Sequence, residues 1–96
     1  MEESELHKAL DAAQQEANTA LCRVQELQSI AADASLIART ALRKEVECSD
    51  YVAPDQYFED ESNVIKALEI AWLTVMEKNE VVKTLKWRIK HNGLLR

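Results

Sequence analysis

Two histidines and two cysteines are the side chains of this sequence that could bind a metal ion or act as a nucleophile. They are His7, Cys22, Cys48 and His91, and their spacing forms no C-x-x-C, H-E-x-x-H or E-x-x-H motif. The pairs of Glu-x-x-His that hold di-iron centres in helical bundles are also missing from the sequence. The sequence therefore predicts no catalytic residue, no metal site and no cofactor, with the histidines as solvated side chains.

The two cysteines are interpreted as free thiols. They are 26 residues apart, which on one straight helix corresponds to roughly 39 Å at about 1.5 Å per residue. Cys48 continues the heptad register described below and is expected as a small core residue, whereas Cys22 is expected to be exposed. Free thiols and the absence of a secretory signal at the acidic start indicate an intracellular protein, cytoplasmic or nuclear.

A basic segment near the end of the chain is the strongest candidate for a binding site. Residues 78–96 hold six lysines and arginines and one acid, a local charge of +5 in a chain of net charge −5. The candidate face consists of Lys83, Lys86, Trp87, Arg88 and Lys90. Such a face could bind nucleic acid, a microtubule, another acidic surface or anionic lipid. The favoured alternative is a solvated helix end, and the net charge makes nucleic acid an unlikely partner.

A continuous heptad pattern is the element around which the chain is organised. Ten apolar positions follow one another at alternating steps of three and four, and seven of them are alanine: Leu10, Ala13, Ala17, Ala20, Val24, Leu27, Ala31, Ala34, Ala38 and Ala41. A period of 3.5 residues over this length predicts a helix packed along another helix, as in a coiled coil. Alanine buries little area, so the partner helix must supply the larger side chains.

The composition and the scarcity of glycine and proline predict an all-α hairpin in one domain. One glycine and one proline leave little room for turns, and no apolar run reaches the roughly 18 residues of a membrane span. We predict a long helix over residues 5–48, a connector over 49–61, a shorter helix over 62–92 and a tail over 93–96. Ser4 and Ser62 are the expected N-caps, and Gly93 the C-terminal stop.

The expected connector is rich in acids and aromatics. It contains Pro54, together with Tyr51, Tyr57 and Phe58, among five acidic residues. We interpret it as a lid whose aromatics fold over the end of the bundle, with an acidic docking loop as the less favoured alternative. Arg39, Arg43 and other basic residues that end the first helix would lie beside the acids that begin the second.

The two predicted helices differ in length. At about 1.5 Å per residue they measure roughly 65 Å and 46 Å. The second helix would then reach only to about Glu16, and the residues before it, including Leu6 and Leu10, would need a covering chain. Apolar residues beside the seam, such as Ile30 and Ile37, also favour three or more helices around one core.

These expectations lead to a non-enzymatic coiled-coil subunit that oligomerises, or joins another helical protein, as a scaffold or adaptor of a larger intracellular assembly. Whether the partner is a second copy or a different subunit stays open. The residues predicted to form the core seam and the interface are Leu6, Leu10, Ala17, Val24, Leu27, Ile30, Ala34, Ile37, Leu68, Trp72, Val75, Val82, Leu85 and Ile89.

Overall fold

The protein is a hairpin of two helices. A computed structural model describes residues 2–92, in which α1 spans Glu3–Glu47 and α2 spans Asp55–His91. The two helices pack extensively against each other and the described residues contain no strand, so the predicted all-α hairpin is confirmed. Helix α1 continues without a break through Ala31–Ser35. The predicted tail 93–96, including Gly93, lies outside the described residues.

Helix α1 begins two residues before the predicted start. The N–H of Leu6 donates to the carbonyl oxygen of Glu2 at 3.0 Å, which closes the first turn. Ser4 therefore lies inside the first turn and is not the cap. Glu3 and Glu5 place negative charge at the positive end of the helix dipole, which favours this start.

Helix α2 begins at Asp55, seven residues before the predicted start, so the predicted connector over 49–61 was too long. The N–H of Tyr57 donates to the carbonyl oxygen of Pro54 at 3.2 Å, and proline suits a helix start because its own N–H is not needed there. The acids that suggested a loop instead complement the helix dipole. Ser62 is consequently an interior residue, and Tyr57 and Phe58 belong to α2.

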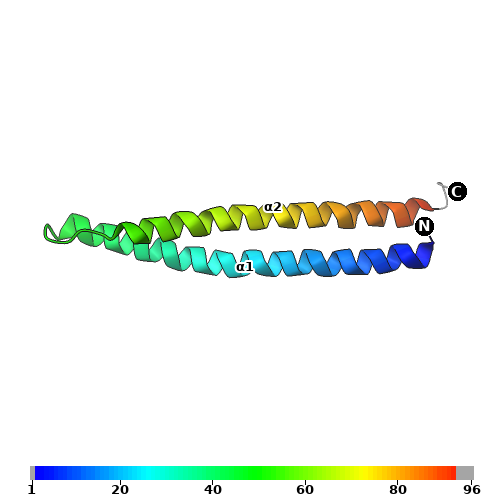
Figure 1. The fold of residues 1–96 in the computed structure, drawn as a ribbon, viewed down its shortest axis with the longest axis horizontal. Helices are drawn as coiled ribbons and strands as arrows, with labels where there is room; N and C mark the ends of the chain where they lie inside the picture. Colours follow the sequence, from blue (N-terminus) through cyan, green and yellow to red (C-terminus); the bar gives the residue numbers. More distant parts are fainter. Residues whose placement is uncertain (1, 93–96) are drawn as a thin grey trace. The chain divides into compact units, whose positions relative to one another are not determined.

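The chain divides into two compact units, each built from parts of both helices. The terminal unit combines the residues up to Arg23 with those from Ala71 onward, and the loop unit is Val24–Ile70. In the terminal unit the blue half of α1 lies beside the orange half of α2 (Figure 1). The loop unit holds the rest of both helices and the connector between them.

The terminal unit has its own apolar core. Ala13, Ala17 and Val82 form a buried cluster, and Leu10 and Leu85 pack against it. Leu6 is also buried. The expectation that the first dozen residues lack a partner in the same chain is therefore wrong. Because the real connector is short and α2 is 37 residues long, α2 extends along this part of α1.

Burial in the loop unit also follows the seam. On α1, Val24, Leu27, Ala38 and Ala41 are buried, while Ala31 and Ala34 are half-buried. On α2, Val64 and Leu68 are half-buried at the expected spacing. All ten seam positions of α1 are thus buried or half-buried, which explains why small residues recur there: they allow close approach of the second helix.

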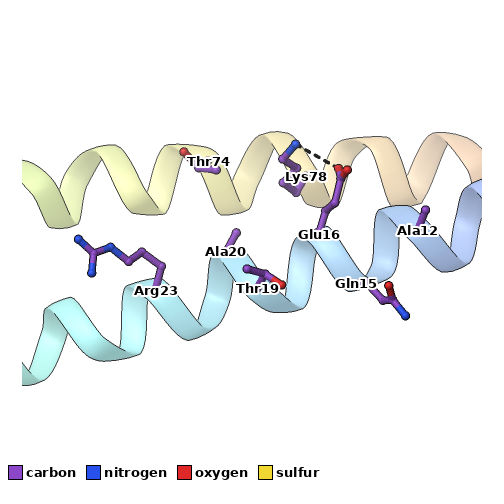
Figure 2. Close-up of a pocket in the computed structure, with 8 residues that line it drawn as sticks. All are labelled: Ala12, Gln15, Glu16, Thr19, Ala20, Arg23, Thr74 and Lys78. Carbon is purple, nitrogen blue, oxygen red and sulfur yellow. Dashed lines mark hydrogen bonds and ion pairs between the residues drawn. The ribbon is translucent and has the colours of Figure 1, made fainter.

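A single lysine interrupts the apolar seam of α2 and has a partner on α1. The ammonium of Lys78 lies 3.2 Å from the Oε2 of Glu16, and the Lys78 side chain is 39% exposed (Figure 2). A pair this exposed contributes at most about 1 kcal/mol to the free energy of folding. Shifted helix alignments would separate the two charges and lose this contribution.

Replacing Lys78 with leucine is expected to stabilise the hairpin. The leucine would bury apolar surface against the alanines of α1, which we expect to outweigh the loss of the exposed ion pair, to add about 1 kcal/mol and to raise Tm by roughly 4–8 °C. Thermal unfolding followed by circular dichroism measures the effect, with the exposed Lys66→Leu as the matched control. A fall in Tm for Lys78→Leu alone would show that the ion pair outweighs the apolar gain.

Candidate protein-binding surface

Many large apolar side chains remain exposed although the seam between the helices is covered. In the terminal unit they are Leu21, Trp72, Leu73, Met76, Val81 and Trp87. In the loop unit they are Ile30, Leu36, Ile37, Leu42, Val46, Val52, Ile65 and Ile70. Exposed apolar residues that gather on a helix face are typical of surfaces that bind other proteins.

Three of these side chains share one face of α2, which we call the tryptophan face: Trp72, Leu73 and Met76. Met76 follows Trp72 by four residues and Leu73 by three, so the three side chains are neighbours on the helix surface. Their exposed fractions are 42%, 57% and 61%. Tryptophan and methionine are enriched in the centres of protein interfaces, because they bury much area with few polar atoms.

Three residues predicted for the core seam are exposed. Ile30, Ile37 and Trp72 are 48%, 50% and 42% exposed. The second helix of this chain does not cover these residues, because each lies one position beside the seam, which turns it about 100° from the covered side. Their part in an interface with another chain stays a prediction. The other eleven predicted residues are buried or half-buried.

An open hollow of about 620 Å³ lies in the terminal unit, where α1 and α2 both contribute side chains (Figure 2). Its lining residues are Ala12, Gln15, Glu16, Thr19, Ala20, Arg23, Thr74 and Lys78. The Lys78 ammonium points to the Glu16 carboxylate, so the two charged groups at this end neutralise each other. Small side chains, chiefly Ala12 and Ala20, leave the hollow open.

The predicted basic face lies at the end of α2 in the terminal unit. All five of its residues are exposed, with Trp87 at 52%. The ring of Trp87 stacks on the ring of His91 with centroids 4.4 Å apart, and the Nδ1 of His91 lies 2.9 Å from the Trp87 carbonyl oxygen. Lys83 pairs with Glu80 at 3.4 Å. Trp87 is thus held against its own helix.

The acidic start of α1 belongs to the same unit as this basic face. Glu3 and Glu5 lie in the first turn of α1, and the carboxylate of Glu3 is 3.8 Å from the Nε2 of His7. The acidic residues of this unit reduce the attraction of the basic face for a polyanion. The geometry therefore adds no specific support to nucleic-acid or microtubule binding.

The residues with metal-binding or nucleophilic chemistry are dispersed over both helices. Both cysteines are exposed free thiols, so Cys48 is not a core residue; α1 ends at Glu47 and the chain leaves the seam there. Within residues 2–92, no three His, Cys, Asp or Glu side chains gather in a way that could hold a metal ion. Neither helix, as far as the described residues show, has an apolar stretch long enough to cross a membrane.

No family model, curated protein or solved structure matches this chain.

Proposed function

We propose that this chain is a non-enzymatic helical subunit that joins another protein chain and acts as a scaffold or adaptor of a larger intracellular assembly. One observation carries the proposal: the tryptophan face stays exposed although the chain covers its own seam. Burying Trp72, Leu73 and Met76 against a partner would contribute several kcal/mol, at about 25 cal/mol per Å² of apolar area.

The spacing of the buried positions supports coiled-coil packing between the helices. Steps of three and four continue along α1 from Leu6 to Ala41 and along α2 from Val64 to Ile89. This pattern uses one face of each helix and leaves the others available for further helices. A partner helix on the tryptophan face would extend the hairpin into a bundle.

Site-specific photocross-linking tests the proposal. A photoreactive phenylalanine analogue at Trp72 should yield adducts with a protein partner in cells that make the chain. The same analogue at Gln15, an exposed polar position of the same unit, should not. An adduct with a second copy or with a different protein would each support the proposal. No adduct from positions 72, 73 and 76 would overturn it.

Polar substitution of the tryptophan face should weaken association without unfolding the hairpin. For Trp72→Ser combined with Met76→Ser we expect at least a tenfold loss of partner binding, since central aromatic residues dominate interface energies. Helicity should stay within error, because both side chains are already exposed. Light scattering and circular dichroism measure the two effects, with Gln14→Ser and Asn18→Ser as controls. Unchanged association would contradict the prediction.

A further inference from the structure

A second stripe with alternating spacing runs along the outer surface of α1 in the loop unit. Its residues are Ala32, Leu36, Arg39, Arg43 and Val46, at steps of four, three, four and three. All five are exposed, with Leu36 at 66% and Val46 at 80%. We call it the arginine stripe. It has the spacing with which one helix contacts another.

The charge of this stripe has one sign. It contains two arginines and no acid. Within the described part of the chain, neither Arg39 nor Arg43 forms an ion pair, although the acids that begin α2 belong to the same unit. Both guanidinium groups are therefore available to bind a carboxylate of another molecule. Arginine donates two parallel hydrogen bonds to a carboxylate in a bidentate geometry.

Two hollows flank the centre of the stripe. One of about 210 Å³ is lined by Leu36, Arg39, Thr40 and Arg43. The other, of about 390 Å³, also includes Leu36 and Thr40 and extends to Lys44, Tyr51 and Tyr57. The Lys44 ammonium lies 4.4 Å from the centre of the Tyr51 ring, so a third cation borders this surface. The hollows offer space for apolar side chains next to the arginines.

We propose that the arginine stripe docks an acidic amphipathic helix of a different protein. The matching helix carries apolar residues opposite Leu36 and Val46 and acids opposite the two arginines, at the same spacing. The inference rests on the proposed function and names the chemistry of a partner. A contact between the stripes of two copies is disfavoured, because a two-fold axis at the centre of the stripe would bring the arginines of both copies together.

The probe is a synthetic helical peptide that carries Leu, Glu, Glu and Leu at successive steps of three, four and three residues. This is the spacing of Leu36, Arg39, Arg43 and Val46 in the stripe. Its binding to the full chain is measured by fluorescence anisotropy at low and high salt. Arg39→Glu combined with Arg43→Glu should weaken binding at least tenfold and should create binding of a peptide with lysines in place of the glutamates. Lys66→Glu, an exposed change in the same unit, should alter binding less than twofold.

Two outcomes would overturn the inference. The first is no binding of the acidic peptide, or binding that survives the arginine changes. The second is a photocross-link from position 36 that joins two copies of this chain. Adducts from Trp72 in the same cells would show that the proposed function stands although the arginine stripe has another role. Circular dichroism of each variant confirms that the hairpin is intact, as expected for exposed positions.

Discussion

Replacing Leu27 with aspartate is expected to unfold the chain and to dissolve any assembly that it forms. Leu27 is 5% exposed at the seam of the loop unit. The substitution removes about 1.5–3 kcal/mol of apolar burial and places an unpaired carboxylate between the helices, so the total exceeds about 4 kcal/mol. Such a loss is comparable to the whole stability of a small domain.

Far-ultraviolet circular dichroism and light scattering over a dilution series measure this effect. Gln28→Asp is the matched control, since Gln28 is the exposed neighbour of Leu27 on the same helix. We expect the control to keep its helicity and its mass. If Leu27→Asp also kept both, the seam would not be the core that holds the helices together.

Enlarging one alanine of the seam should separate the helices. Ala38 is 2% exposed, so a phenylalanine there has no space without backbone movement. We expect Ala38→Phe to cost about 1–3 kcal/mol and to lower Tm by roughly 4–8 °C for each kcal/mol.

The exposed Ala32 provides the matched control, because it lies on the same helix and in the same unit. Ala32→Phe changes side-chain volume equally but meets only solvent, so its Tm should shift by less than about 2 °C. Thermal unfolding of both variants measures the two Tm shifts to be compared. Equal shifts would mean that the small residues of the seam are not required for close packing.

The seam was predictable from the sequence because the spacing of apolar residues determines which side of a helix is covered. All ten positions from Leu10 to Ala41 are buried or half-buried. The start of α2 was not predictable in the same way. Its first turns carry Asp55, Glu59 and Asp60, a composition equally typical of loops, and the apolar period there rests on a few aromatic side chains.

The exposed faces illustrate a second limit of sequence reasoning. The sequence predicts no role for Leu36 or Leu73, because both lie outside the continuous heptad seam. The signal was nevertheless present: Leu36, Arg39, Arg43 and Val46 already have helical spacing in the sequence. Which of two such stripes faces the second helix depends on side-chain size, and the alanine-rich stripe allows the closer approach.

The division into two units favours one order in which the hairpin closes. The loop unit is continuous in sequence, so its contacts between helices close shorter stretches of chain than those of the terminal unit. The terminal unit joins residues such as Glu16 and Lys78, which are 62 positions apart. During synthesis the first half of α1 emerges well before its intramolecular partner. Leu6, Leu10 and Ala17 are therefore uncovered in the nascent chain, and this interval is when the protein is most open to chaperones or to premature association.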